Sequence, residues 1–293
     1  MYDYLLLSID LESMAGQSKS PNQLTDDPLV RLVTPYQLTL GMEVLESENG
    51  RSMSRMKANR RIAKTLDDPR PDPLALMGFI DQGLSQSLQG MIAPGIGLST
   101  FDLRIGLSSA AAMGDKLTLT AETVMVGNAS ATVTGTLTNS ANDIVGVSTG
   151  LFRLGSYPGG APADHNLAGT FDPQDMPGPM TRSLGLSGAA NSPQITAGNR
   201  AILGWESGNI VHGGVVAAAL MAACQGRVAD GKNSNGQQLE SIDIRYLRPA
   251  IGSRDLLTSS HFEREGNAAS FVRATCFHGP DKPLATAIAT FVR

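Results

Sequence analysis

Apolar residues recur at helical spacing in two well-separated stretches of the chain. Leu74, Met77, Ile80, Leu84 and Leu88 follow one another at intervals of three or four residues, which predicts a helix over 74–88 with one apolar face. Pro73 suits the first turn of that helix. The stretch 213–228 begins with two glycines and continues with small apolar residues on nearly every side. Such a helix has no polar face, so we expect it to be buried.

Segments rich in β-forming residues surround these two helices and predict an antiparallel sheet. Asn49-Gly50 favours a hairpin between two of these segments. Runs of strands interrupted by single helices are typical of an α+β fold. The predicted strands are 38–46, 52–59, 98–107, 116–126, 131–138, 144–154, 182–186, 194–203, 239–247, 256–263, 269–277 and 284–292.

The order of elements repeats at a nearly constant spacing. Gly127-Asn128-Ala129 matches Gly266-Asn267-Ala268 with a numbering offset of 139 (266 minus 127), and Phe152 matches Phe291 with the same offset. We therefore expect two related domains, each with a strand pair, a helix and four strands, joined along a sheet edge. The predicted boundaries are an N-terminal domain over 1–154, a Pro/Gly-rich linker over 155–180 and a C-terminal domain over 181–293.

Composition narrows the classes of function. The formal net charge of −4 argues against nucleic-acid binding, and no apolar run reaches the length that spans a membrane. The first ten residues lack the basic segment of a signal peptide, so we expect a cytoplasmic protein. Two cysteines in apolar stretches indicate buried thiols. The four histidines are scattered without the spacing of metal ligands, so we expect no metal site, and we also expect no cofactor.

Candidate chemistry gathers at the start of the second helix, in His212-Gly213-Gly214. The first turn of a helix has N–H groups with no partner inside the helix, and the helix dipole favours negative charge there. Two glycines leave those groups uncovered. This tip is therefore a candidate cradle for the oxyanion that forms when a carbonyl is attacked.

The repeat indicates which acid faces this tip. With a numbering offset of 140, the equivalent of Asp81 in the second half is Met221, and the equivalent of His212 in the first half is Asp72. The first helix therefore carries the carboxylate but no His-Gly-Gly start, and the second carries the His-Gly-Gly start but no carboxylate. If the helices pack antiparallel about a pseudo-twofold axis, the start of one lies near the middle of the other. One complete site then forms from Asp81 and the His-Gly-Gly tip, and the mirror site is inert.

The run 212–222, followed by the segment 242–250 with its Tyr-Leu-Arg-Pro-Ala end, resembles the hot-dog acyl-CoA thioesterases, particularly the phenylacetate-pathway-like branch. The resemblance implies a fused, double hot-dog protein that hydrolyses acyl-CoA to free acid and coenzyme A. It implies that Asp81 is the general base or the nucleophile and that Gly213 N–H is the oxyanion donor. It also implies that His212 positions the thioester or shapes the turn, and that Thr100 holds the attacking water.

Further candidate substrate contacts flank this set. Relatives can carry Asn at the position of Glu206, and an arginine such as Arg248 could meet the phosphates of coenzyme A. The full set of predicted substrate-binding residues is Gly214, Glu206, Gln82, Asn209 and Arg248.

Two other functions stay open: a non-catalytic binder of acyl-CoA or a lipid-like ligand, and a hot-dog hydratase or dehydratase. A fused pair already supplies the dimer of single-domain relatives, so a monomer or a homodimer is compatible with the sequence.

Overall fold

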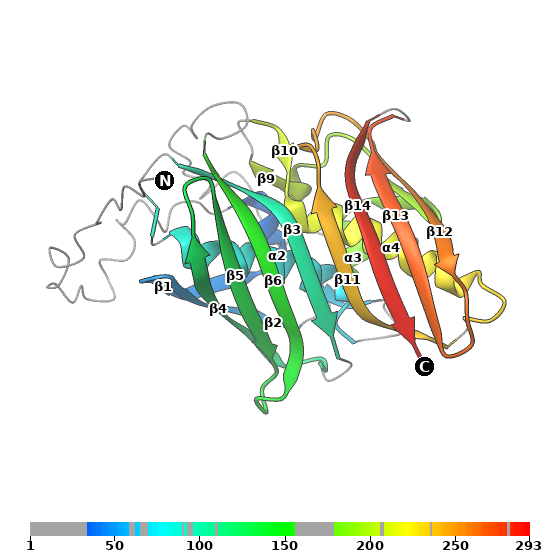
Figure 1. Ribbon diagram of the computed structural model, residues 1–293, viewed down its shortest axis with the longest axis horizontal. Helices are drawn as coiled ribbons and strands as arrows, with labels where there is room; N and C mark the ends of the chain where they lie inside the picture. Colours follow the sequence, from blue (N-terminus) through cyan, green and yellow to red (C-terminus); the bar gives the residue numbers. More distant parts are fainter. Residues whose placement is uncertain are drawn as a thin grey trace, which may run out of the picture.

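The computed structural model describes residues 34–58, 62–64, 70–89, 91–92, 96–108, 111–155, 179–205, 208–234, 236–279 and 282–293. These residues build one twelve-stranded antiparallel sheet, and a separate pair of short strands lies beside it. Figure 1 shows the two long helices, α2 (Pro73–Gln89) and α4 (Gly213–Ala229), on the same side of the sheet. Within the described ranges, no helix is long and apolar enough to cross a membrane.

The first half of the sheet surrounds α2. A short helix, α1 (Pro35–Leu40), precedes it in the chain. The long apolar side chains of α2, among them Met77, Phe79 and Leu84, are fully buried. The strands are β1 (Met42–Glu48), β2 (Arg51–Lys57), β3 (Gly97–Leu107), β4 (Lys116–Val126), β5 (Ser130–Thr138) and β6 (Ile144–Gly155).

The second half surrounds α4 in the same way. It includes a short helix, α3 (Met180–Ser183), a 3-10 turn, η5 (Arg200–Ile202), and the separate pair β9 (Leu203–Trp205) and β10 (Ile210–Val211). Its sheet strands are β7 (Leu186–Ala189), β8 (Ser192–Ile195), β11 (Gln238–Tyr246), β12 (Leu256–Arg264), β13 (Ala269–Phe277) and β14 (Pro283–Val292).

The two halves meet edge to edge, and their strand orders mirror each other. The order across the sheet is β1-β2-β4-β5-β6-β3-β11-β14-β13-β12-β8-β7, so β3 and β11 form the seam. Their pairing runs from Gly106 opposite Ser241 to Asp102 opposite Arg245. Joining along an edge in this way is what the sequence predicted.

Hydrogen bonds at the helix starts repeat between the halves. The N–H of Asp72 donates to Ile62 at 2.7 Å, and the N–H of His212 donates to Ile202 at 2.9 Å. The side chains of Asp72 and His212 each accept the N–H two positions later, both at 2.9 Å. The numbering offset is 140 in both cases (212 minus 72, and 202 minus 62). The repeat read from the sequence is therefore present in the backbone, whereas the exact domain boundaries stay a prediction.

The strand predicted over 38–46 is wrong at its beginning. Residues Pro35–Leu40 form α1, and β1 starts only at Met42. Thr34 caps this helix with a side-chain oxygen that accepts from Gln37, and Gly41 ends it in the left-handed conformation with φ of 65°. A proline in the first turn completes the local signals for a helix, which outweigh the β propensity of the segment.

Two predicted strands of the second half also differ. Residues 182–186 divide between the end of α3 and the start of β7. The strand predicted over 194–203 ends at Ile195, and Asn199 then caps the 3-10 turn by accepting from the N–H of Ala201. Within the predicted linker 155–180, residues 156–178 lie outside the described part of the chain, Gly155 ends β6 and Met180 begins α3.

The helices α2 and α4 approach each other at two glycines. A Cβ atom added at Gly214 would lie 2.4 Å from the Cα of Gly78. Real Cβ atoms do not come this close to a backbone atom, so only glycine permits this crossing. The crossing brings the N-terminal tip of α4 against the middle of α2, as the sequence predicted.

Replacing the glycine on α4 tests this close contact. We expect Gly214→Ala to lower the free energy of unfolding by about 2–3 kcal/mol, because the methyl group forces the helices apart. An added Cβ at Gly279 would meet nothing within 4 Å, so Gly279→Ala is the matched control and should leave stability nearly unchanged. Urea unfolding of both variants measures the difference, and equal midpoints would show that the helices can separate without cost.

Candidate functional site

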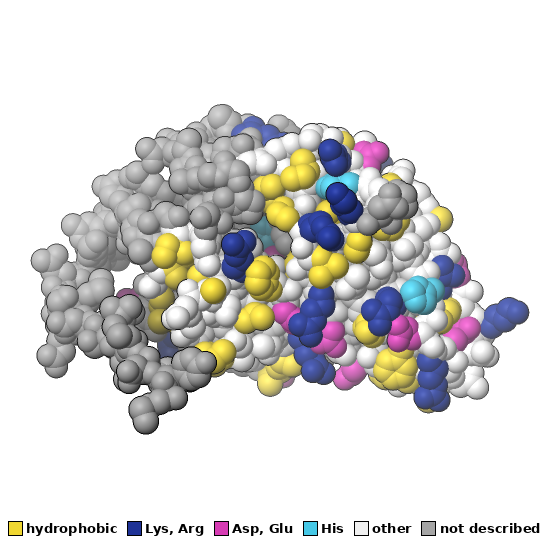
Figure 2. All heavy atoms as spheres, turned by 45° about the horizontal axis from the view of Figure 1, so that its top comes forward, with side chains coloured by type: hydrophobic (Ala, Val, Ile, Leu, Met, Phe, Trp, Pro, Cys, Tyr) yellow, Lys and Arg dark blue, Asp and Glu magenta, His cyan; other side chains and the backbone are white. Residues whose placement is uncertain are grey.

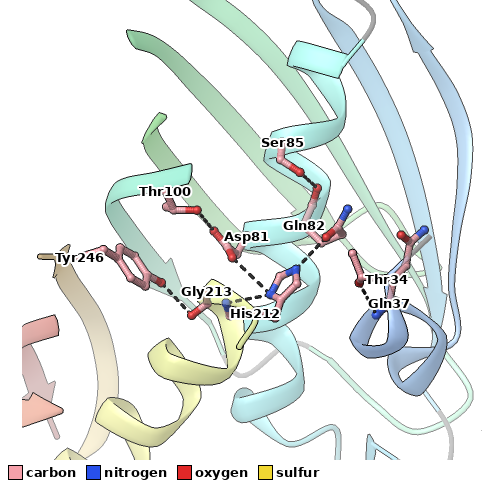
Figure 3. A network of polar contacts seen from close by, with 10 residues as sticks. Thr34, Gln37, Asp81, Gln82, Ser85, Thr100, His212, Gly213 and Tyr246 are labelled. Atoms are coloured by element: carbon pink, nitrogen blue, oxygen red, sulfur yellow. Dashed lines mark hydrogen bonds and ion pairs between the residues drawn. The ribbon is translucent and has the colours of Figure 1, made fainter. Parts of the chain in front are cut away.

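The crossing places the carboxylate of Asp81 against the tip of α4. A methyl group at Gly213 would lie 2.7 Å from Oδ2 of Asp81 and 3.5 Å from the hydroxyl of Thr100. A side chain at position 213 would therefore displace the carboxylate from its place against the tip. Figure 3 shows Asp81, Thr100, His212 and Gly213 gathered at this point from α2, β3 and the start of α4. Asp81 and the tip of α4 are therefore neighbours in space, and their action as one composite site stays a prediction.

Asp81 is a buried carboxylate, with 3% of its surface exposed. Burial raises the pKa of Asp81 from 3.8 to about 6, while hydrogen bonds from the Thr100 hydroxyl and the Gly214 N–H lower it part of the way back. The Thr100 hydroxyl donates to Oδ1 at 2.8 Å. Oδ1 is therefore held in place, and Oδ2 is the oxygen that faces Gly213.

His212 caps α4 in its neutral form. Its Nδ1 accepts from the N–H of Gly214 at 2.9 Å, so the ring proton is on Nε2, which donates to Oε1 of Gln82 at 2.7 Å. Burial lowers the pKa of His212 to about 3. The approach of 3.5 Å between Nδ1 and Oδ2 of Asp81 is therefore not an ion pair at neutral pH. His212 shapes the turn, and Gln82 fixes its ring.

The backbone N–H of Gly213 is available at the tip. Among the described residues, we find no acceptor for this N–H, whereas the next three N–H groups all bond to His212. An unpaired N–H at the positive end of a 17-residue helix is a favourable place for an anionic oxygen.

The site lies where the seam of the sheet opens. The pairing of β3 with β11 ends where Asp102 lies opposite Arg245. Thr100 lies two residues beyond this pair on β3, next to a register shift between Thr100 and Asp102. Figure 2 shows the surface hollowed at the junction of the halves, with hydrophobic and basic side chains around the hollow. Phe101 and Leu247, the residues that follow Thr100 and Tyr246, are 43% and 51% exposed.

The other predicted substrate contacts divide into three cases. Gln82 lies in the site but bonds to His212. The carbonyl of Asn209 accepts from the N–H of Gly252 at 2.8 Å, and the exposed Arg248 donates to the carbonyl of Pro283 at 2.7 Å, so each is engaged by a neighbouring loop or strand. Glu206 lies outside the described residues. Substrate contacts from these residues stay predictions.

Two tyrosines near the site were missed by the sequence analysis. Tyr246 donates its hydroxyl to the carbonyl of Gly213 at 3.1 Å. The ring of Tyr36 lies 4.8 Å from the ring of His212, tilted by 46°. The segment with Tyr246 was noted for its similarity to a family, but nothing in its pattern points to the helix tip. Tyr36 precedes the strand predicted over 38–46, and helix α1, which forms there instead, brings it to His212.

The mirror position carries apolar residues in place of the polar ones. The sheet register makes Leu239 the equivalent of Thr100. In the sheet, Thr100 lies opposite Phe152, and Leu239 lies opposite Phe291. The numbering offset is 139 both from Thr100 to Leu239 and from Phe152 to Phe291. The helix spacing makes Met221 the equivalent of Asp81, and Met221 is fully buried. The second half thus lacks the carboxylate and the hydroxyl that form the site, as predicted for Met221.

Among the described residues, no group of three or more His, Cys, Asp or Glu side chains is arranged to hold a metal ion. The two cysteines, Cys224 and Cys276, are free and buried. Burial raises the pKa of both thiols to about 12, so neither is a thiolate at neutral pH.

The second half of the chain matches a known family. Residues 202–292 match the model of the acyl-CoA thioesterase N-terminal domain, a range that includes the whole of α4 and the strands β11 to β14. No curated protein matches the chain in sequence.

Solved structures share the fold over most of the chain. The 12:0-ACP thioesterase from Umbellularia californica is similar with a TM-score of 0.55 at 10% identity, over 82% of this chain and 93% of that chain. A candidate thioesterase from Novosphingobium aromaticivorans is similar with a TM-score of 0.55 at 15% identity, over 85% and 97%. At these identities the likeness shows the fold. The predicted double hot-dog fold and the resemblance to hot-dog thioesterases are confirmed, and the narrower phenylacetate-like branch stays a prediction.

The raised pKa of Asp81 predicts a pH-dependent stability. Because the folded-state pKa is above the unfolded value, protonated Asp81 stabilises the fold fully below about pH 4, and this stability is lost as the pH rises through about 6. A shift of this size corresponds to roughly 3 kcal/mol. We expect Asp81→Asn, which stays neutral, to be more stable than the wild type at pH 8 and similar at pH 3.5. Urea unfolding at both pH values tests this, and a wild type that is the more stable protein at pH 8 would contradict it.

Proposed function

We propose that this protein is an acyl-CoA thioesterase with one composite site, to which the first half gives Asp81 and the second half gives the tip of α4. The observation that carries the proposal is the position of the buried Asp81 carboxylate, whose Oδ2 faces Gly213 at the start of a helix. The match of residues 202–292 to the acyl-CoA thioesterase family supports the thioester as substrate.

The proposed reaction uses Asp81 as a general base. Oδ2 takes a proton from water while the water oxygen forms a bond to the thioester carbonyl carbon. Because Thr100 donates to Oδ1, the carboxylate is oriented with Oδ2 toward the reacting atoms. The Thr100 oxygen keeps lone pairs that can accept a hydrogen bond from the same water, which is the role expected from the sequence.

The negative charge then moves to the former carbonyl oxygen. In our proposal, the N–H of Gly213 and the dipole of α4 stabilise this oxyanion, an effect worth roughly a hundredfold in rate for one donor. When the tetrahedral intermediate collapses, the carbon–sulfur bond breaks. The proton held by Asp81 passes to the thiolate of coenzyme A, and the products are the free acid and the thiol.

The neutral state of His212 fits this assignment. A protonated His212 beside Asp81 would hold the carboxylate charged and reduce its basicity. With its pKa lowered to about 3 by burial, His212 leaves Asp81 with a pKa of about 6. A base with this pKa is ionised at neutral pH and is strong enough to take a proton from attacking water.

Removing the carboxylate tests the function directly. We expect Asp81→Asn to lower kcat/KM for acyl-CoA hydrolysis at least about a hundredfold while the protein stays folded. Met221→Leu changes the mirror position at nearly constant volume and should keep the wild-type activity. Thiol release from a panel of acyl-CoA esters measures both. Full activity of folded Asp81→Asn would remove the assignment, and binding of the esters without thiol release by the wild type would favour a non-catalytic binder.

The pH dependence of the reaction follows from the same group. Since the base must be ionised, we expect kcat/KM to rise between pH 5 and 7 with a midpoint near the pKa of Asp81, about 6. The profile is measured with one acyl-CoA ester at constant ionic strength. A rate that is flat across this range would exclude Asp81 as the group that must lose a proton.

A further inference from the structure

Tyr246 contacts the site without being part of the proposed reaction. It is the last residue of β11, and its hydroxyl donates to the carbonyl of Gly213 at 3.1 Å. Figure 3 shows the phenol directed from the strand to the tip of α4, on the opposite side of Gly213 from His212. A strand side chain thus holds the first residue of the helix.

The contact reaches Asp81 through a single peptide group. The Gly213 carbonyl and the Gly214 N–H belong to the same planar peptide, so a donor on the oxygen polarises the N–H. This N–H donates to His212 at 2.9 Å and also lowers the pKa of Asp81. The chain of polar groups therefore runs from the Tyr246 hydroxyl through the peptide to the carboxylate.

The mirror half carries an apolar residue at the position equivalent to Tyr246. Tyr246 pairs with Ala285 in the sheet, and Leu107 pairs with Gly146. The numbering offset between the two pairs is again 139 (246 minus 107, and 285 minus 146), so Leu107 is the equivalent of Tyr246. Leu107 stands at the corresponding place on its strand and has no hydroxyl, so of these two equivalent positions only the one on the side of Asp81 carries a phenol.

We propose that Tyr246 is a positioning residue of the site, whose hydroxyl fixes and polarises the Gly213–Gly214 peptide that faces Asp81. The inference rests on the proposed function, because it concerns the same site. It adds a group that acts through the peptide and predicts a measurable effect on the carboxylate even in the absence of turnover.

The surroundings of Asp81 make its titration simple to interpret. The titratable groups that face it are His212 from the start of α4, Tyr36 from α1 and Tyr246 from β11. Burial raises the pKa of both tyrosines and lowers that of His212 to about 3. Asp102 and Cys276 lie near Tyr246, and burial raises the pKa of each. The two tyrosines, His212 and the thiol are thus uncharged while Asp81 titrates.

The first experiment is a carboxyl ¹³C NMR titration of the full chain labelled at aspartate, with the Asp81 signal assigned by its loss in Asp81→Asn. In Tyr246→Phe the N–H of Gly214 is a weaker donor, so the carboxylate is less stabilised. We expect the midpoint of Asp81 to move upward by about 0.3–0.5 pH unit. An unchanged or lower midpoint in the folded variant would overturn the proposal.

A matched variant separates positioning from packing. Ser260 on β12 shares its hydroxyl proton between two carbonyls, that of Ala223 in the same helix at 2.9 Å and that of Asn191 at 2.6 Å, far along α4 from the tip. Ser260→Ala removes a comparable strand-to-helix bond and should leave the Asp81 midpoint and kcat unchanged. Tyr246→Phe should lower kcat roughly tenfold with little change in KM, because the proposed oxyanion donor belongs to the residue it fixes. Equal effects of the two variants would make Tyr246 merely structural.

A second substitution keeps the proposal testable if Tyr246→Phe does not fold. Installing 3-fluorotyrosine at position 246 retains the ring and the hydroxyl but makes the hydroxyl a stronger donor, so the Asp81 midpoint should move downward. No shift would contradict the proposal. Because the NMR midpoint needs no turnover, a wild type that does not hydrolyse acyl-CoA would disprove the proposed function and leave this test intact.

Discussion

The close approach of α2 and α4 at Gly78 and Gly214 is the constraint on which the rest of the structure depends. No side chain separates the helices there, so the first turn of α4 reaches the third turn of α2. This brings backbone N–H groups, which ordinarily face water or a cap, against the Asp81 carboxylate inside the protein. A larger residue at either glycine would move the tip away from the acid.

Around this crossing, an almost symmetrical scaffold holds an asymmetrical set of side chains. Strand order, helix-start hydrogen bonds and the register shift at the seam strand repeat between the halves. The polar groups do not, since Met221, Leu239 and Leu107 replace Asp81, Thr100 and Tyr246. A buried carboxylate costs stability, and a second copy would cost it again. A core with one such carboxylate is therefore more stable than a core with two.

Much of this arrangement could be predicted from the sequence because its signals are local or periodic. The apolar stripe of 74–88, the Asn49-Gly50 hairpin and the constant spacing of the repeat lead to the two halves and to the pairing of Asp81 with Gly213. What could not be predicted depends on contacts between distant segments. The bonds of Tyr246 and Gln82 to the tip of α4 follow from how strands and helices cross in space. Helix α1 is the exception: its signals, Thr34 and Pro35, are local, and they were missed because the cap was not recognised.

The central claim is that the chain holds one site, built from both halves. It is tested most directly by counting sites with an acyl-CoA analogue whose thioester sulfur is replaced by a methylene group, which binds but is not hydrolysed. The account predicts that calorimetric titration finds one site per chain. Two equivalent sites per chain would contradict it, because the mirror position would then bind the thioester as well.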